Sequence, residues 1–340
     1  MAYRITLIPG DGIGPEVVEA TQEILAATPV AIEWETHNAG LEVARLTGTP
    51  LPPTVIEAVR RNRVALKGPV TTPIGQGFRS VNVTLRQTLD LYANVRPIRS
   101  LPNVEPRFGD VHMVIVRENT EGLYAGLELM ILPGVAQSIK LTTERGSTRI
   151  ADFAFRYARQ HRRKRVTFVH KANIMKISDG LALECARRVA KLHPEVELAE
   201  MIVDATAMTM VRDPNRLGVI VTENLYGDIL SDLGAGLVGG LGIVPGANIG
   251  DDAAIFEAVH GSAPDIAGKG FANPTALIQS AVMMLRHLGE MVVASRIERA
   301  LTDLYRDGEI RTRDLGGTAS TDDFTAAICK RLAVSTMPRV

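Results

Sequence analysis

The chain has 340 residues, 46% of them hydrophobic and 22% charged, a composition that excludes a disordered protein and allows two domains. Its 38 basic and 38 acidic residues cancel, so no overall field favours nucleic acid or a membrane surface. Cys185 and Cys329 lack the CxxC spacing of a metal or disulfide site, and MAYRITLIPGDG lacks the apolar core of a secretory signal. We therefore expect a cytoplasmic protein that binds neither nucleic acid nor a membrane.

Strand and helix patterns alternate along the chain. A strand over residues 5–8 leads through the loop PGDGIGPE into a helix over 15–27, whose apolar residues recur at helical spacing. The further runs typical of strands are 64–66, 111–116, 166–170 and 219–222, and those typical of helices are 149–159 and 180–191. This alternation predicts an α/β fold.

Three segments depart from this alternation. Residues 121–143 are rich in apolar residues but broken by Pro133 and Gly134, which predicts a β arm that leaves the main sheet and suits subunit contact. Residues 233–250 approach the length of a membrane span, but their repeated glycines and proline favour a bent, packed segment. We interpret the basic run 162–165 as a solvated helix end before a strand, with a nucleic-acid patch as the alternative.

Gly234, Gly236 and Gly239 match the GxGxxG pattern of dinucleotide-binding loops. That pattern requires a strand directly before the first glycine, whereas here the strand ends near Thr222 and YGDILSDL intervenes. The N-terminal GDGIGPE lacks the third glycine and predicts a tight turn before a proline-started helix. A dinucleotide would therefore be held by other means, and the donor-rich loop 260–274, HGSAPDIAGKGFANP, could wrap an adenosine.

Two carboxylates, Asp228 and Asp232, stand four residues apart in GDILSD and so share one face of a helix. They can form a solvated surface pair, but the apolar neighbours Ile229 and Leu230 indicate a largely buried segment, in which the pair would need a cation. Oxygen ligands without nearby His or Cys favour Mg²⁺ or Mn²⁺ over Zn²⁺. Asp204, after an apolar strand-like run, could complete this site.

Cations and small polar groups gather in the first half of the chain. Arg86, Arg96 and Arg117 could converge on a ligand with several carboxylates, because guanidinium binds carboxylate through two bonds. Each of them taken alone is equally a surface arginine. Lys171, at the end of an apolar strand, is a candidate base or a snorkelling side chain, and Tyr124 is a candidate acid or a packing residue.

These segments together resemble the β-decarboxylating dehydrogenases, the family of the isocitrate, homoisocitrate, isopropylmalate and tartrate enzymes. The similarity runs nearly end to end and is carried by LIPGDGIGPE, LYANVRP, VIVRENTEGLYAG, VHKANIMK, NLYGDILSD, GGLGIVPGANIGD and HGSAPDIAGKGFANP. It implies an isopropylmalate/isocitrate dehydrogenase-like α/β fold, in which two α/β domains share a twisted mixed sheet, and not a Rossmann fold. The implied domains are 1–99 plus 251–340, with the cofactor loop, and 100–250, with the metal site and the dimer arm.

The resemblance also implies roles for single residues. The implied catalytic residues are Tyr124, Lys171 and Asp204, the metal ligands are Asp204, Asp228 and Asp232, and the substrate-binding residues are Ser80, Asn82, Arg86, Arg96 and Arg117. The implied NAD-binding residues are Thr72, Asn173, His260, Asp265, Ile266 and Asn273. In the family the lysine and the first aspartate enter the site from the partner subunit, which implies a homodimer with shared sites, or a higher oligomer.

Substrate and cofactor follow from two of these matches. Ser80 and Asn82 match the pair that isocitrate enzymes use on the extra carboxylate, where isopropylmalate enzymes are apolar, and Asp265 and Ile266 stand where NADP-dependent relatives have lysine and tyrosine. The resemblance implies NAD-dependent decarboxylation of the tricarboxylate isocitrate to 2-oxoglutarate and CO₂ with Mg²⁺ or Mn²⁺. Homoisocitrate and 3-isopropylmalate are alternative substrates. A catalytically silent regulatory subunit is the alternative of a different class, although every implied residue is present.

Overall fold

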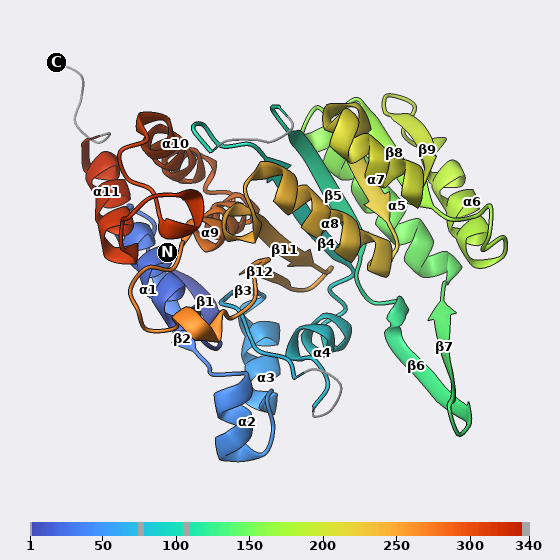
Figure 1. Ribbon diagram of the computed structural model, residues 1–340, viewed down its shortest axis with the longest axis horizontal. Coiled ribbons are helices and arrows are strands. Elements are labelled where there is room, and N and C mark those ends of the chain that lie inside the picture. The colour runs from blue at the N-terminus through green and yellow to red at the C-terminus, as the bar shows by residue number, and fades with distance from the viewer. Residues whose placement is uncertain (1, 74–77, 105–108, 335–340) are drawn as a thin grey trace.

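The computed structural model describes residues 2–73, 78–104 and 109–334, and its largest element is a ten-stranded sheet (Figure 1). The strands follow one another across this sheet in the order β2, β1, β3, β12, β11, β4, β5, β10, β8, β9. Their bounds are β1 Tyr3–Ile8, β2 Ile32–Thr36, β3 Val64–Lys67, β4 Ala93–Arg99, β5 His112–Glu118, β8 Arg165–His170, β9 Glu197–Ile202, β10 Val219–Thr222, β11 Pro245–Ile249 and β12 Ala254–Ala258. A separate two-stranded sheet joins β6 Gly122–Leu132 to β7 Val135–Leu141.

The large sheet consists of two parallel blocks joined by an antiparallel seam. The first block is β2, β1, β3 and β12, and the second is β5, β10, β8 and β9. Strands β11 and β4 lie between the blocks and pair antiparallel on both sides. The expected α/β fold on one mixed sheet is therefore present. The expected domain division at residues 99 and 250 remains a proposal, and the sheet is continuous across it.

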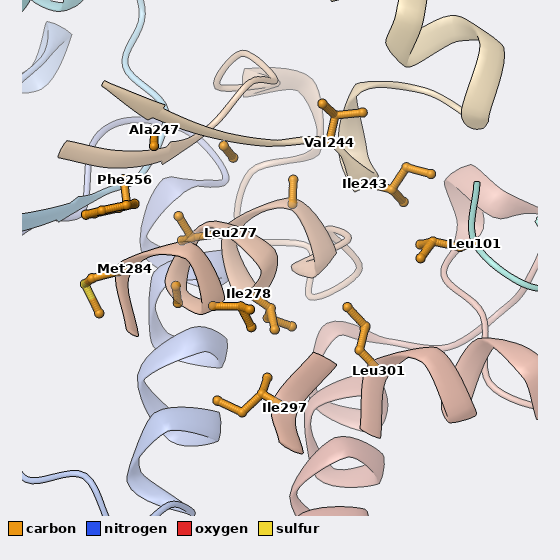
Figure 2. Close-up of a cluster of buried hydrophobic side chains, with 14 of the residues drawn as sticks. Leu101, Ile243, Val244, Ala247, Phe256, Leu277, Ile278, Met284, Ile297 and Leu301 are labelled. Carbon is orange, nitrogen blue, oxygen red and sulfur yellow. The ribbon is translucent and has the colours of Figure 1, made fainter. Parts of the chain in front are cut away.

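Helices alternate with the strands along the chain, and several of them pack against the large sheet. They are α1 Gly14–Ala26, α2 Leu41–Thr47, α3 Pro53–Asn62, α4 Val81–Thr88, α5 Glu144–Gln160, α6 Ser178–Ala190, α7 Val203–Arg212, α8 Asn224–Val238, α9 Thr275–His287, α10 Met291–Asp307 and α11 Thr321–Val334. In Figure 2, α9 lies between Phe256 of β12 and Ile297 of α10. A helix covered in this way is apolar around most of its surface, as TALIQSAVMMLRH is.

Strand β5 is covered on both faces, which decides where its last residues point. Met113 and Ile115 belong to the core cluster that contains Leu230 of α8, whereas Val114 and Val116 belong to the cluster that contains α5. Because successive side chains of a strand alternate between its faces, Arg117 falls on the α8 face.

The arm expected over residues 121–143 is the β6–β7 hairpin, which projects from the body of the molecule (Figure 1). Its apolar side chains exposed in the single chain are Leu123, Leu127, Leu129, Met130, Ile131, Leu132, Val135, Ile139 and Leu141. The uncharged residues 233–250 form the end of α8, a 3-10 turn and β11. None of the helices in the described ranges combines the length and hydropathy that a bilayer crossing requires.

The structure agrees with the expectation that the GxGxxG match is not a dinucleotide-binding loop, and it corrects two other expectations. Gly234 and Gly236 lie inside α8 and Gly239 follows its last residue, so the pattern is not a dinucleotide loop. The helix expected to begin at residue 149 begins five residues earlier, because the Thr143 hydroxyl caps it by accepting from the Gly146 amide at 3.0 Å. The segment around Asp228 is less buried than expected, since Ile229 is 59% exposed in the single chain.

Candidate active site

Arg86, Arg96 and Arg117 line one pocket of about 220 Å³. Arg117 pairs in register with Asn94 across the seam between β5 and β4, so Arg96, two residues further along β4, lies on the same α8-facing side. Arg86 enters from the last turn of α4. The sequence left these side chains open as surface arginines, but their exposures are only 9%, 6% and 1%.

The three guanidinium groups repel one another, and helix α8 balances part of their charge. Burial, followed by the charges of Arg117 and Arg86, lowers the pKa of Arg96 to about 10. The partners on α8 are Asn224 and Asp228 for Arg117, and Ser231, Asp228 and Asp232 for Arg96. Buried cations with this little counter-charge favour an anionic ligand. The pocket is therefore suited to a molecule with several carboxylates.

Two charged residues of this pocket, Lys67 and Glu257, were missed by sequence reasoning. The register of β3 and β12 places them side by side, with Nζ and Oε2 2.6 Å apart. Glu257 also accepts from Arg86 at 3.1 Å and from Asn248 at 2.7 Å. Burial raises the pKa of Glu257, but Lys67 and Arg86 lower it to well below the usual range. Glu257 thus fixes Arg86, and the signal in the sequence is a single acid inside the apolar run AIFEAV.

Tyr124 and Asp228 also line the pocket, and they are paired with each other. The Tyr124 hydroxyl donates to Asp228 Oδ2 at 2.5 Å, and the Arg117 guanidinium lies 5.0 Å from the centroid of the Tyr124 ring. Burial, then the hydrogen bond to Asp228, raises the pKa of Tyr124. Burial opposes ionisation of Asp228, but Arg117, Tyr124 and Arg96 lower its pKa below the ordinary value. The pair is a protonated donor beside an ionised carboxylate.

Asp228 and Asp232 share one face of α8, and their side chains are 36% and 56% exposed. Gly227 allows α8 to pack closely against β5, because a methyl group at this position would come within 2.5 Å of Cγ of Arg117. Two oxygen donors one helical turn apart fit a divalent cation such as Mg²⁺ or Mn²⁺. The described residues contain no group of three His, Cys, Asp or Glu side chains that could hold a metal ion. The carboxylates of α8 are thus part of a possible cation site.

Ser80, Asn82 and Thr72 lie around the start of α4. Ser80 caps the helix, since its Oγ accepts from the Val83 amide at 3.5 Å, and Thr72 donates to the same oxygen at 3.4 Å. Ser80 and Asn82 line the arginine pocket, and the Asn82 Oδ1 atom is buried with no partner in the described residues. An amide carries both donors and an acceptor, so Asn82 can turn either toward a ligand.

Lys171 and Asp204 are not brought into this pocket. Lys171 follows β8, Asp204 lies in the first turn of α7 after β9, and the two side chains form an ion pair with each other. The Lys171 hydrogen bond lowers the pKa of Asp204. Asn173 lies two residues beyond Lys171 and is exposed. The single chain therefore does not bring Asp204 to the Asp228 site, because β9 is the edge strand and places Asp204 with Lys171 instead.

A second pocket of about 630 Å³ lies beside the first, and both are lined by His260 and Gly261. Of the residues expected to bind adenosine, His260, Ile266 and Asn273 line it, and Asp265 is exposed next to Ile266. Burial lowers the pKa of His260, and its buried Nε2 has no partner among the described residues. This free ring nitrogen fits a polar ligand group. Phe271, inside the expected loop, also lines this pocket, and so do Arg313 and Asp314, which the sequence pattern missed.

Comparison with known proteins shows the family of this chain. Residues 4–328 match the family model described as isocitrate/isopropylmalate dehydrogenase. The chain belongs to this family. It is 52% identical to isocitrate dehydrogenase (NAD) catalytic subunit 5, mitochondrial, of Arabidopsis thaliana, over 96% of this chain and 88% of that protein. It is 50% identical to a mitochondrial regulatory subunit of isocitrate dehydrogenase (NAD) from Dictyostelium discoideum, over 98% of this chain and 92% of that protein.

A solved structure of the same family gives the same result for the fold. The crystal structure of isocitrate dehydrogenase from Methylococcus capsulatus superposes with a TM-score of 0.95 at 54% identity, covering 98% of this chain and 99% of that one. The likeness of this family member confirms the isocitrate dehydrogenase-like fold that the sequence motifs implied.

The expected cytoplasmic location is contradicted by the relatives. The Arabidopsis and Dictyostelium proteins of this family are both named as mitochondrial, as are the corresponding proteins of Drosophila melanogaster and Bos taurus. Two cysteines without disulfide spacing indicate a reducing compartment, and this criterion does not separate the cytosol from the mitochondrial matrix. Composition was therefore unable to support the narrower conclusion.

Proposed function

We propose that this chain is a catalytic subunit of an NAD-dependent isocitrate dehydrogenase, which oxidises isocitrate and releases CO₂ to give 2-oxoglutarate. The observation that carries the proposal is the buried set of Arg86, Arg96 and Arg117 with Ser80 and Asn82 in the same pocket. An alkyl group at the start of α4 would leave buried polar atoms unpaired at a cost of about 1–3 kcal/mol each. This disfavours 3-isopropylmalate. Homoisocitrate is the closer alternative, since one methylene changes binding by only about 1–3 kcal/mol.

The chain's own residues divide the work of this reaction. The three arginines hold the substrate carboxylates, and Lys171 with Asp204 takes the proton of the hydroxyl group. Asp228, Asp232 and Asp204 would hold a divalent cation, whose positive charge would stabilise the new carbonyl, and bound NAD would serve as the hydride acceptor. Tyr124 then donates a proton to the carbon that loses CO₂, which its raised pKa suits because it stays protonated at neutral pH.

The second pocket is proposed to take the adenosine half of NAD. Asp265, exposed beside Ile266 of this pocket, can accept hydrogen bonds from the ribose hydroxyls and would repel a 2′-phosphate. His260, Ile266 and Asn273 would contact the nucleoside, while Thr72 and Asn173 would lie toward the nicotinamide. NAD⁺ should therefore be preferred over NADP⁺.

The catalytic unit is proposed to be a homodimer in which each site uses residues of both chains. Lys171 and Asp204 form an ion pair outside the arginine pocket, and that pocket contains neither the proposed base nor the proposed third metal ligand from the described residues of its own chain. In a dimer, Lys171 and Asp204 of one copy would supply both to the pocket of the other. Large apolar side chains stay exposed in the single chain around the proposed contact, on the arm and at Ile174, Ile177 and Met208. The relatives are named as subunits of both kinds, and the presence of all implied catalytic residues favours the catalytic kind here.

Initial rates test this proposal directly. The purified chain should be assayed with isocitrate, homoisocitrate, 3-isopropylmalate and malate, each with NAD⁺ and NADP⁺, and with Mg²⁺ or Mn²⁺. Isocitrate with NAD⁺ should give the highest kcat/KM and produce CO₂ in step with NADH. Turnover with none of the four acids at any protein concentration that supports a dimer would instead favour a regulatory role.

A further inference from the structure

The function proposed above gives no role to the turn of residues 9–14, between β1 and α1, although it is one of the chain's most glycine-rich motifs. It lies between two segments that come from distant parts of the sequence. The Asp11 amide donates to the Pro69 carbonyl at 2.8 Å, and the Ile13 amide donates to the Ser262 carbonyl at 2.9 Å. We name residues 68–72 the first wall and residues 260–266 the second wall.

Each wall borders the two pockets. Pro69 and Val70 of the first wall line the arginine pocket, and Thr72 follows them. The second wall contains His260, which lines both pockets, and Ile266, which lines the larger one. The distance between the walls therefore affects the space available to a ligand that extends from one pocket into the other.

Two glycines allow the turn to fit between the walls. Gly10 and Gly12 have φ values of +80° and +60°, which residues other than glycine rarely adopt. A methyl group on Gly10 would overlap the Pro69 carbonyl oxygen, and one on Gly12 would overlap the Ser262 carbonyl oxygen. The turn thus requires glycine for close approach as well as for conformation.

Asp11 fixes the turn to the first wall. Its carboxylate is 7% exposed and accepts from the Thr71 amide at 2.8 Å and from the Leu41 amide, at the start of α2, at 3.0 Å. Hydrogen bonds from backbone amides to an ionised carboxylate are about twice as strong as neutral ones. The Thr71 and Ser262 hydroxyls lie 2.6 Å apart and connect the walls directly.

The second wall is itself strained where the turn holds it. Ala263 has a φ of +39°, a left-handed conformation that costs a residue with a Cβ about 1–2 kcal/mol. Strain of this kind persists only where surrounding contacts hold it. The bond from Ile13 to Ser262, and the Ile13 side chain that lines the larger pocket with Ala263, supply such contacts.

We propose that the turn sets the separation of the two walls and so pre-forms the dinucleotide site, with Asp11 and Gly12 as positioning residues that do not touch the reacting atoms. This inference rests on the proposed binding of NAD by the second wall. A site held in its binding conformation loses less entropy on binding, so loosening the walls should weaken NADH more than isocitrate.

Gly12→Ala tests the proposal, and Gly48→Ala is its matched control. Gly48 also has a left-handed φ, +80°, but a methyl group there would meet nothing within 4 Å, so the control carries the backbone strain without the overlap. NADH affinity is measured by fluorescence titration, KM for isocitrate by steady-state kinetics, and hydrogen exchange of both walls without ligand. Gly12→Ala should weaken NADH at least about tenfold and speed exchange in residues 260–266, with the control within about twofold of the wild type.

Thr71→Val covers the case in which Gly12→Ala fails to fold, because it removes only the hydroxyl that reaches Ser262. It should weaken NADH about threefold, which is within the range expected for the loss of one hydrogen bond. Wall exchange and NADH affinity equal to those of the control in Gly12→Ala, or equal to the wild type in Thr71→Val, would overturn the inference. A wild type that binds no NADH would overturn the proposed function instead, while the exchange measurement would still report whether the turn holds the walls.

Discussion

Arg117 and Lys171 stand at the carboxyl ends of two strands in the same parallel block, β5 and β8, yet their surroundings differ completely. Arg117 is 1% exposed and is held by Asn224 and Asp228 of its own chain. The Lys171 side chain is 27% exposed, and Asp204, with which it forms an ion pair, is 63% exposed. A buried charge must be balanced by its own chain, whereas a charge at the rim stays available to another molecule. One chain therefore builds the arginine pocket but leaves the proposed base outside it.

The largest effect should come from Lys171, which lies outside the arginine pocket of its own chain. Lys171→Met should lower kcat by about 10³-fold, within the range for loss of a general acid or base. Isocitrate and NADH should still bind nearly as in the wild type, because Lys171 contributes nothing to the pockets of its own chain. Stopped assays and NADH fluorescence separate the two effects.

Mixed dimers sharpen the same comparison. Inactive Lys171→Met and Tyr124→Phe chains, unfolded and refolded together, should recover part of the activity if each site draws on two chains. A Lys171→Met variant with near-normal kcat would rule out the proposed base, and mixtures as inactive as their components would argue against shared sites.

The next largest effect should come from Glu257, one of the buried charges in the pocket that contains Arg117. Glu257→Gln leaves Lys67 and Arg86 without their counter-charge, and breaking a buried pair in this way costs about 3–5 kcal/mol. Urea unfolding measures this loss. Glu33→Gln is the control, since its pair with Arg4 is more than half exposed on both sides and contributes at most about 1 kcal/mol.

The pH dependence of the same variant gives an independent check. The pKa of Glu257 is lower in the folded chain than in the unfolded one, so its ionisation stabilises the fold fully above the unfolded pKa of about 4.3. That stabilisation is lost as the pH falls toward the folded value. The free energy of unfolding should therefore drop more steeply below about pH 4.3 in the wild type than in Glu257→Gln. Parallel curves would contradict the assigned ion pair.

Asp265 lies, like Lys171, at a rim, and its effect should be on choice of cofactor. Wild-type kcat/KM should favour NAD⁺ over NADP⁺ by about a hundredfold, as expected for repulsion between a carboxylate and a 2′-phosphate. Asp265→Lys combined with Ile266→Tyr should move the preference toward NADP⁺ and remove most NAD⁺ activity. An unchanged NAD⁺ preference in the double variant would show that the adenosine-loop assignment is wrong.

The smallest effect should come from the polar pair of the arginine pocket. Ser80→Ala combined with Asn82→Leu should lower kcat/KM for isocitrate at least about tenfold, one hydrogen bond's worth, and affect malate much less. Equal losses on both substrates would remove the reason for preferring isocitrate. The apolar pair should at the same time improve any weak activity on 3-isopropylmalate.

The sequence singled out the three arginines, Tyr124 and Asp228 of the first pocket because their signals are local. Arg117 ends an apolar run, and Asp228 and Asp232 share helical spacing, so each residue's position within its own element was readable. The pair of Lys67 and Glu257 was not readable, since it depends on the register of two strands separated by most of the chain. The same limit explains Asp204, whose neighbour is decided by the order β10, β8, β9 and not by the spacing of aspartates.

For the GxGxxG match, the residues around the glycines predicted their role more reliably than the pattern itself did. The missing strand before Gly234 excluded a dinucleotide loop, and α8 runs through the first two of these glycines. No sequence signal reveals why a glycine is needed inside a helix, however. Gly234 lies where a methyl group would overlap Ile98 of β4, which is a contact between elements and not a local preference.

Gly227 carries a consequence for the evolution of this enzyme. A glycine inside a helix costs about 1 kcal/mol relative to alanine, so a substitution to alanine should on helix propensity alone be stabilising. It is closed to the chain, because the position is occupied by the aliphatic part of Arg117. A more stable α8 and the present position of Arg117 therefore exclude each other at residue 227. On the proposed function, new specificities are easier to reach at the start of α4, where Ser80 and Asn82 line the arginine pocket.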